Sequence, residues 1–308
     1  MRPLARPLLA VDWGTSSLRG ARIDTGGRVT DSRQFAHGIL SVPPGGFEQV
    51  FDTCFGDWVQ ADTLCLISGM AGSRQGWREA AYCPCPAGFD ELGRHLLWLT
   101  PGRMALVPGL SCQPPHGPDL KLHDVMRGEE IQIFGALALT GRQDATVVLP
   151  GTHSKWARVE GGKVVSFTTF MTGEVYAVMG QHSILSRTLQ HDAPWSDSAF
   201  DQGLQLARHT PSVLSSLFTT RTLALFDSLP ASAHASFLSG LLIGEELRAM
   251  QGSTGHDTLV LVGHAGMTER YARGLSQLGI GSQRLDDAAT WAGHAALART
   301  LNTPTPRP

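Results

Sequence analysis

Residues 8–17 read Leu8-Leu9-Ala10-Val11-Asp12-Trp13-Gly14-Thr15-Ser16-Ser17. The apolar run at the start predicts a short buried strand, and the glycine with its hydroxyl neighbours predicts a loop. Residues 18–24 are typical of a second strand and residues 25–27 of a Gly-Gly turn, and a third strand is expected from Arg28 onward. The segment therefore predicts a β-meander whose first connection is a polar, glycine-containing loop.

A stretch near the middle of the chain repeats this pattern. Residues 146–149 form a β-branched run, residues 150–154 read Pro150-Gly151-Thr152-His153-Ser154, and residues 155–170 hold two more runs around a Gly-Gly turn. The second copy is shorter by two residues. Any two hairpins around Gly-Gly would look similar, but here loop and turn match together and in order. We therefore expect two domains that open with the same meander.

Length and composition exclude several classes of protein. A chain of 308 residues is longer than an ordinary domain with one core, which has about 100–150 residues, so two domains are expected. Hydrophobic residues make up 42% of the chain, which is enough to form such cores. With 25 Lys and Arg against 27 Asp and Glu, we expect no nucleic-acid partner, and no apolar run reaches the roughly 18 residues of a membrane span. The N-terminal residues are unlike a secretory signal, and five cysteines, an odd number, indicate free thiols in the cytoplasm.

The remaining pattern is mainly helical. Ile131, Phe134 and Ala138 fall on one face of a helix expected over residues 127–140. Later elements are helices across 174–250, a strand at 258–262, a helix with Thr268 as its N-cap, and a last helix at 288–301. A joint at 141–144 predicts domains at 1–142 and 143–302, with a flexible tail at 303–308.

Three strands run into glycine loops, at Gly14, Gly151 and Gly263. Backbone N–H groups in such loops can close on an anion, and Thr and Ser hydroxyls add donors. A polyphosphate is the anion that several loops from two domains would bind. The sequence holds neither a Walker motif nor a Gly-x-Gly-x-x-Gly at a helix start, which excludes P-loop and Rossmann sites.

Asp12 ends the first buried strand with no basic residue next to it in sequence. A carboxylate there is costly unless it meets a cation or several donors. Two readings remain open: a contact to Mg²⁺, direct or through water, or a turn in which Asp12 accepts hydrogen bonds from Gly14 and Thr15. The second copy has Leu149 at this position, so the repeat supplies no second metal carboxylate.

Glu129 and Glu130 lie in the first turn of the helix expected after Arg127. Acidic residues there stabilise many helices, by about 0.3–1 kcal/mol, and the pattern alone favours this structural role. In the functional reading, one of them is a general base for a hydroxyl group, and Arg127 binds a substrate carboxylate with two hydrogen bonds.

Longer strings resemble one enzyme family. Residues 12–19 resemble the first phosphate loop of the superfamily of sugar kinases, acetate kinase, Hsp70 and actin, and residues 263–266 its adenosine loop. Gly128-Glu129-Glu130 with Phe134-Gly135 resembles the helix that carries the catalytic Asp in glycerol-kinase-like enzymes. The strings similar to 2-dehydro-3-deoxygalactonokinases are residues 69–73 with Gly76-Trp77, 126–130, 150–156, 171–174 and 237–244.

The resemblance extends to about residue 300. It implies an α/β fold of two ribonuclease-H-like domains, of the actin/hexokinase type, flanking a nucleotide cleft that binds ATP and Mg²⁺. It implies transfer of the γ-phosphoryl group to the 6-hydroxyl of 2-dehydro-3-deoxy-D-galactonate. The residues expected to contact the nucleotide are Gly14, Thr15, Ser16, Ser17, Gly151, Thr152, His153, Ser154, Gly263, His264, Ala265 and Gly266.

The resemblance also implies the remaining roles. Asp12 is expected to position Mg²⁺, and Glu129, with Glu130 as the alternative, to accept the hydroxyl proton. Lys155 would neutralise the transferred group, unless it is a solvated lysine on a strand. Ser73, Trp77 and Arg127 are expected at the sugar acid, although Trp77 also suits plain packing.

Two departures and several alternatives stay open. The base position carries Glu129 in place of the usual Asp, and the second phosphate loop lacks an Asp seen in some relatives.

The chain could instead phosphorylate another sugar or 2-keto-3-deoxy acid, or serve as a sugar sensor, although we expect too little chain before Asp12 for a DNA-binding segment. We expect a sugar-acid substrate, no membrane partner, and a monomer or homodimer. Residues 111–119 are expected to form a loop over the cleft or a surface connection.

Overall fold

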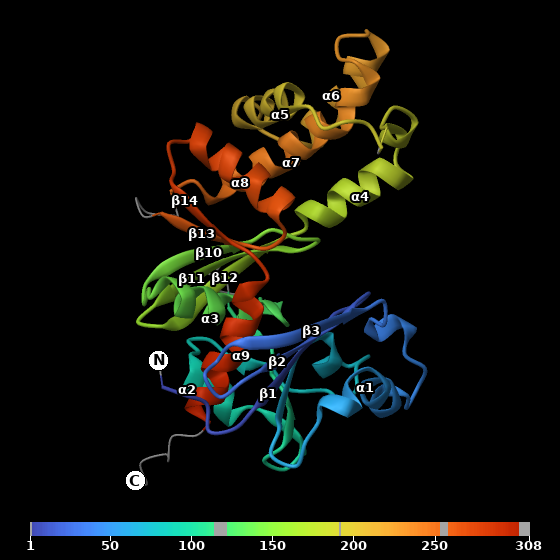
Figure 1. The fold of residues 1–308 in the computed structure, drawn as a ribbon. Helices are drawn as coiled ribbons and strands as arrows, with labels where there is room; N and C mark the ends of the chain where they lie inside the picture. Colours follow the sequence, from blue (N-terminus) through green and yellow to red (C-terminus); the bar gives the residue numbers. More distant parts are fainter. Residues whose placement is uncertain (1, 114–121, 191, 253–257, 302–308) are drawn as a thin grey trace. The chain divides into compact units, whose positions relative to one another are not determined.

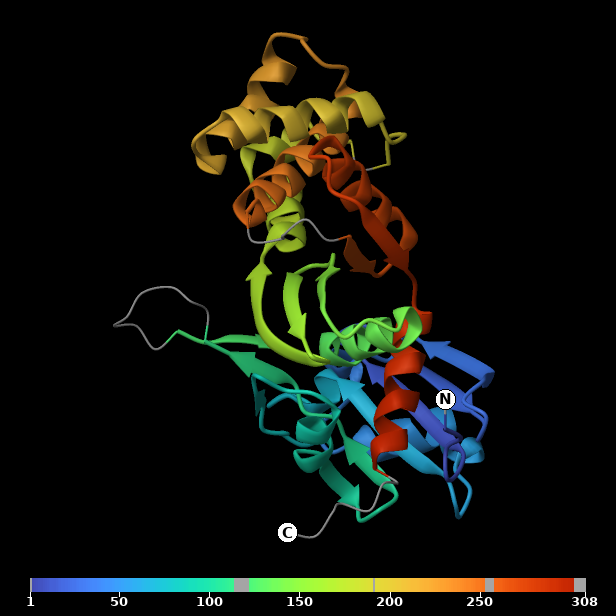
Figure 2. The ribbon, with the colours of Figure 1, turned by 90° about the vertical axis from the view of Figure 1, so that its left-hand side faces the viewer.

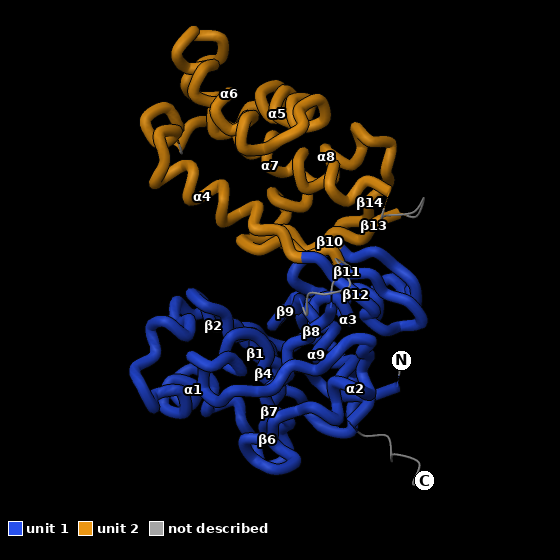
Figure 3. The backbone as a smooth tube through the Cα atoms, turned by 180° about the vertical axis from the view of Figure 1, so that it is seen from behind, with its two compact units in different colours: residues 1–147, 157–168, 285–308 blue, residues 148–156, 169–284 orange. Residues whose placement is uncertain are grey.

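The structure is a computed structural model that describes residues 2–113, 122–190, 192–252 and 258–301. The chain divides into two compact units (Figure 3). Unit 1 comprises residues 1–147, 157–168 and 285–308, and unit 2 comprises residues 148–156 and 169–284. The expected tail at 303–308 and most of the proline-rich segment at 111–119 lie outside the described residues.

The first sheet has the strand order β3-β2-β1-β4-β7-β6. Its first three strands are labelled in Figure 1. The meander expected at the N-terminus is confirmed, because β2 pairs antiparallel with both β1 and β3, while β4 runs parallel to β1. The strands are β1 (Leu8–Trp13), β2 (Leu18–Ile23), β3 (Val29–Phe35), β4 (Leu64–Gly69), β6 (Leu97–Thr100) and β7 (Met104–Leu106).

The second sheet repeats this order as β12-β11-β10-β13-β14. Its strands are β10 (Ala145–Leu149), β11 (Ser154–Glu160), β12 (Lys163–Phe170), β13 (Leu259–Val262) and β14 (Ser282–Leu285). Each sheet therefore places its three consecutive strands in the order 3-2-1 and adds a later strand beside the first. This shared order confirms the duplicated, ribonuclease-H-like α/β fold that the sequence predicts.

Aromatic side chains of α1 (Phe47–Phe55) fill the core under the first sheet. Phe47, Phe51 and Phe55 recur at helical spacing and are buried against β1. A Cβ at Gly20 of β2 would lie 2.4 Å from the Phe55 ring, so only glycine lets the helix approach this closely. The core thus holds β1, and the loop that follows it, in place.

Unit 1 also contains a small sheet and two helices that follow the main strands. The elements are β5 (Cys83–Pro84), β8 (Leu110–Cys112), β9 (Asp124–Met126), α2 (Phe89–Arg94) and α3 (Glu129–Thr140). Because β9 leads directly into α3, the small sheet positions the N-terminus of that helix.

The last helix, α9 (Ala288–Thr300), belongs to unit 1 rather than to a C-terminal domain that begins at residue 143. It lies beside α3 (Figures 1 and 2). Glycines make this contact possible, because a Cβ at Gly135 would lie 1.7 Å from Ala289 O and one at Gly293 would lie 2.0 Å from Ile131 O. Close packing between segments far apart in sequence therefore sets the unit boundary.

Replacing Gly293 with alanine should destabilise the protein. The added Cβ would collide with the Ile131 carbonyl, and such overpacking costs about 1–3 kcal/mol, more than the roughly 1 kcal/mol gained in helix propensity. Urea unfolding would measure the loss. Gly56→Ala is the matched control, since its backbone is already helical and its Cβ would meet only Asp52 at 3.7 Å. Equal stability of the two variants would contradict the packing argument.

Helices dominate unit 2, as expected for residues 174–250. They are α4 (Thr172–His182), α5 (Asp197–His209), α6 (Val213–Leu225), α7 (His234–Met250) and α8 (Ala265–Gln277). The expected N-cap at Thr268 is wrong, because α8 begins earlier: His264 is the cap, and its Nδ1 accepts from Gly266 N at 3.3 Å. In the described part of the chain, no helix is long and apolar enough to cross a membrane.

Candidate active site

The first glycine loop lies in unit 1 between β1 and β2. Gly14 N donates to Ser17 O at 2.9 Å and closes the loop, while Thr15 and Ser16 at its tip are exposed. A Cβ at Gly38 would lie 2.3 Å from Ser16 N, so the following segment supports the loop from behind. The expected phosphate loop is thus a firm turn with hydroxyl groups at the surface.

Asp12 has a cationic partner that local sequence does not indicate. The antiparallel register of β1 and β2 places Arg19 opposite Asp12, and Arg19 Nη2 donates to Asp12 Oδ2 at 2.6 Å. Arg19 Nη1 also lies 2.8 Å from Asp287 Oδ2. The reading of Asp12 as a turn residue is not supported, since Gly14 N–H goes to Ser17 O instead.

The start of α3 lies next to Asp12 in unit 1. A Cβ at Gly69 would lie 3.2 Å from Asp12 Oδ1, and one at Gly128 would lie 3.3 Å from Gly69 Cα. Gly128 has φ +108°, which a side chain would strain. The glycines let β1, β4 and α3 converge, and they bring Asp12 near the Glu129 region.

Glu129 and Glu130 occupy different environments. Glu129 Oε2 accepts from Arg127 N at 3.0 Å and its side chain is partly exposed, whereas Glu130 is fully buried, with Oε2 accepting from Gly128 N at 2.6 Å. Burial, followed by the Glu129 charge, raises the pKa of Glu130 to about 8. Of the two carboxylates, only that of Glu129 is accessible to a ligand, as a general base must be.

The raised pKa of Glu130 predicts a pH-dependent stability. The pKa of Glu130 is about 8 in the folded protein, whereas the ordinary pKa of a glutamate is 4.5, so unfolding releases a proton between these pH values. This contribution to the free energy of unfolding is present in full below about pH 4.5 and is lost as pH rises towards 8. Glu130→Gln, which cannot titrate, should flatten this slope in urea unfolding at pH 5 and pH 8. An unchanged slope would show that Glu130 is ionised in the folded protein.

The Arg127 cradle is formed by Arg127, Ser73, Ala80 and Tyr82. It contains hydrogen-bond donors that have no partner among the described residues. Arg127 Nη2 donates to Ala80 O at 2.8 Å, and the guanidinium lies 4.4 Å from the centre of the Tyr82 ring. Arg127 Nε and Nη1, and Ser73 Oγ, are buried with no hydrogen-bond partner among the described residues. A Cβ at Gly72 would lie 2.9 Å from Arg127 Nη1, which places the guanidinium against the 69–73 segment. Unpaired buried donors are costly, so they indicate a ligand that offers acceptor oxygens.

Trp77 packs inside unit 1. Its ring lies 5.8 Å from Phe51, 6.1 Å from Trp13 and 6.4 Å from Phe47, measured between centroids. This arrangement is the plain packing that the sequence left open. The expected contact of Trp77 with a sugar acid stays a prediction.

The second glycine loop, in unit 2, is joined to the start of α4. Glu174 N donates to Thr152 O at 3.0 Å, and His153 Nε2 lies 2.5 Å from Glu174 Oε2. A Cβ at Gly173 would lie 2.4 Å from Gly151 O. The loop and the first turn of α4 therefore form one rigid element.

Ser154 and Lys155 are buried, unlike the rest of this loop. Ser154 Oγ donates to Glu246 in α7, so its hydroxyl proton points into the core. Lys155 is 4% exposed, and the reading of a solvated strand lysine is therefore wrong. Burial of a lysine in β11 requires a partner for its charge.

A cavity of about 330 Å³ opens beside the second loop, within unit 2. Its lining residues include Gly151, Thr152, Thr172 and Ser239, and the larger residues Tyr176, Leu242, Ile243 and Met267. Few polar groups on an apolar wall are typical of a nucleotide or small-molecule site. Sequence reasoning assigned no role to Thr172, although it lies in one of the strings that carry the family resemblance.

Arg270 connects this cavity to the third glycine loop. Arg270 also lines a second cavity, of about 500 Å³, together with Gly266 and Trp195. Its guanidinium lies 3.9 Å from the Trp195 ring centre, and burial lowers the pKa of Arg270. A Cβ at Gly263 would lie 3.6 Å from Pro150 O, so the second and third loops adjoin in unit 2.

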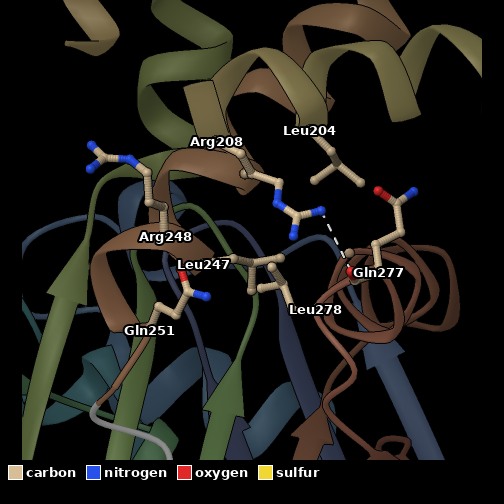
Figure 4. A pocket seen from close by; sticks show the side chains of 9 residues that line it. Leu204, Arg208, Leu247, Arg248, Gln251, Gln277 and Leu278 are labelled. Atoms are coloured by element: carbon tan, nitrogen blue, oxygen red, sulfur yellow. Dashed lines mark hydrogen bonds between the residues drawn. The ribbon is translucent and has the colours of Figure 1, made fainter. Parts of the chain in front are cut away.

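A further hollow between α5, α7 and α8 is too small for a ligand. Leu204, Leu247 and Leu278 line it, and Arg208 Nη1 donates to Gln277 O at 3.5 Å across it (Figure 4). Its volume of about 10 Å³ holds at most one water molecule. The two larger cavities along α8 are therefore the better candidates for a nucleotide.

The duplicated fold and its glycine loops are those of a two-domain kinase, a phosphotransferase with an alcohol group as acceptor. The model of the 2-keto-3-deoxy-galactonokinase family matches residues 12–297, and the chain belongs to this family.

Known relatives match over nearly their whole length. A probable 2-dehydro-3-deoxygalactonokinase of Rhizobium meliloti is 36% identical over 95% of this chain and 96% of its own. The 2-dehydro-3-deoxygalactonokinase of Escherichia coli is 32% identical over 95% of this chain and 98% of its own. The crystal structure of a Sinorhizobium meliloti protein assigned the same enzyme name is 34% identical, with a TM-score of 0.86 over 96% of this chain and 99% of that one.

Proposed function

We propose that the protein transfers the γ-phosphoryl group of ATP to the 6-hydroxyl of 2-dehydro-3-deoxy-D-galactonate. The observation that carries the choice of a sugar acid is the Arg127 cradle, where buried donors of Arg127 and Ser73 have no partner among the described residues. A carboxylate supplies the oxygens that these donors need. A neutral sugar would offer these donors no charged acceptor.

In this proposal unit 1 binds the sugar acid. Arg127 Nε and Nη1 bind its carboxylate, and the Tyr82 ring covers one face of the guanidinium. Glu129 accepts the proton of the attacking hydroxyl, because its carboxylate is partly exposed while that of Glu130 is buried. A glutamate has a longer side chain than the aspartate expected at this position, so the hydroxyl group must lie farther from the α3 backbone.

The nucleotide is bound by the glycine loops. The 151–154 loop, with the 330 Å³ cavity beside it, takes the phosphates, and the 263–266 loop, which reaches the 500 Å³ cavity through Gly266, takes the adenosine. The 14–17 loop of unit 1 presents the exposed hydroxyls of Thr15 and Ser16 as further phosphate contacts. Lys155 neutralises the transferred group. Phosphoryl transfer depends mainly on such positioning and charge neutralisation.

Asp12 fits a role at Mg²⁺. One carboxylate next to phosphate oxygens is a donor set that this ion prefers, and Arg19 engages only Oδ2 of Asp12. When bound, Mg²⁺ would offset negative charge on the phosphates. Arg19 would keep the Asp12 side chain oriented, whatever the state of the nucleotide.

A coupled assay of ADP release tests the proposed function. The panel contains 2-dehydro-3-deoxy-D-galactonate, its gluconate epimer, and the neutral sugars galactose and glucose. We expect turnover with the 2-keto-3-deoxy acids, fastest with the galactonate, none with the neutral sugars, and a ³¹P signal coupled to the protons at carbon 6 of the product. Binding of the acid without ADP release would favour a sensor, and turnover of neutral sugars would overturn the assignment of Arg127.

A further inference from the structure

A buried carboxylate of α7, that of Glu246, accepts four hydrogen bonds within unit 2. Glu246 is 2% exposed. Its Oε1 accepts from Ser154 Oγ at 2.5 Å and from Trp156 Nε1 at 2.6 Å. Its Oε2 accepts from Tyr271 OH at 2.7 Å and from Thr172 Oγ1. Such a set of donors offsets the cost of placing a carboxylate in the interior.

The four donors come from three elements that are distant in sequence. Ser154 and Trp156 lie in β11, Thr172 begins α4, and Tyr271 lies in α8. An indole N–H can only donate. Burial, together with the charge of Glu246, raises the pKa of Tyr271 well above its ordinary value, so the phenol keeps its proton. Glu246 therefore fixes the direction of all four groups.

Two of these elements, α4 and α8, line the 330 Å³ cavity, together with the loop before β11 and with α7 itself. Thr172 lines it directly, Ser154 ends the loop whose Gly151 and Thr152 line it, and Tyr271 follows Arg270 in α8. Glu246 itself lies in the core behind them. Its carboxylate thus acts on the cavity only through the residues that it holds.

Surface contacts fix the other side of the loop. Glu174 binds Thr152 O through its backbone and His153 through its side chain. The loop is therefore held to α4 twice, once at the surface by Glu174 and once in the core by Glu246. The core contact is the one that also includes α8.

We propose that Glu246 is a positioning residue for the nucleotide, which holds the 151–154 loop and the start of α4 in the arrangement that binds phosphates. The inference rests on the proposed assignment of this cavity to ATP. It goes beyond that assignment, because it places the control of nucleotide affinity in a core residue that no ligand touches.

Glu246→Gln is the decisive variant. The amide oxygen can still accept from Ser154 and Trp156, but the amide nitrogen in place of Oε2 cannot accept from Thr172 and Tyr271. Calorimetric titration with ATP should show a dissociation constant raised about tenfold or more, because two hydrogen bonds that hold the site in place, from Thr172 and Tyr271, are lost. The KM for ATP should rise by a similar factor, while the KM for the sugar acid stays within about twofold.

Matched variants separate positioning from stability. Glu245→Gln makes the same chemical change one residue earlier, at a side chain that pairs with Arg248, and should leave ATP affinity unchanged. Tyr271→Phe removes one donor and keeps the ring, so it should weaken ATP binding in the same direction as Glu246→Gln but by less. Because its bulk is preserved, it decides the question if Glu246→Gln does not fold.

Each outcome has a distinct meaning. A folded Glu246→Gln protein with wild-type affinity for ATP overturns the inference, as does an equal rise in both KM values or wild-type protein that binds no ATP. A wild-type protein that binds ATP but phosphorylates none of the acids overturns the proposed function alone. In that case the calorimetric loss in Glu246→Gln and Tyr271→Phe still supports the inference.

Discussion

Glu129→Gln is expected to lower kcat by about 10²–10⁴-fold, the contribution of a general base. The amide keeps the size of the side chain and can still accept the hydrogen bond from Arg127 N, which is 3.0 Å long with the carboxylate. It cannot accept the proton of the attacking hydroxyl group. ATP binding and the KM for the sugar acid should remain near those of the wild type. Steady-state kinetics with the coupled assay, and calorimetry for ATP, would measure both.

Glu129→Asp is the matched comparison for this variant. It keeps the charge and restores the residue type usual in the superfamily, but it withdraws the carboxylate by one methylene group. We expect intermediate activity, above that of Glu129→Gln. Near wild-type turnover of Glu129→Gln would exclude Glu129 as the base and would direct attention to Glu130.

Arg127→Met is expected to raise the KM for the sugar acid by about 10²–10³-fold, with a much smaller change for ATP. Methionine fills part of the same space without charge or donors. Removing one partner of a buried charged pair costs about 2–5 kcal/mol, or about 30- to 5,000-fold in affinity, and the expected change lies within these limits. The change should appear as a KM effect, since Arg127 binds a part of the substrate that does not react.

The stability of Arg127→Met provides an independent readout. Two donor groups of Arg127 are buried without a hydrogen-bond partner among the described residues, so the variant should unfold at the same temperature as the wild type or higher. Arg94→Met, at an exposed arginine paired with Glu91, is the control and should change neither KM. A large loss of stability with an unchanged KM would identify Arg127 as a structural residue.

Local sequence predicted the elements that carry the site. The strands before Gly14 and Gly151, the helix after Arg127, and the strand before Gly263 all appear where their patterns indicated. Each is encoded in a short run of residues by apolar periodicity and by glycine at the turns. The family strings then identified the kinase class, because they combine these elements in one order.

Side-chain environments were predicted less well. Sequence reasoning found no basic side chain to pair with Asp12, although Arg19 lies only seven residues later and reaches Asp12 across a hairpin. It treated Ser154 as a phosphate contact, whereas the structure directs its hydroxyl to Glu246. It also kept Glu130 as the alternative to Glu129 for the general base, although Glu130 is fully buried.

The sequence by itself determined the duplicated fold, the glycine loops and the family. Only the tertiary structure decided which charges are paired, which carboxylate is exposed, and that α9 belongs with α3 in unit 1. The physical reason is the distance along the chain between the residues that determine each feature. Turns and strands follow from neighbouring residues, whereas burial and pairing depend on which distant segments pack together, such as Gly293 against Ile131 or Tyr271 against Glu246.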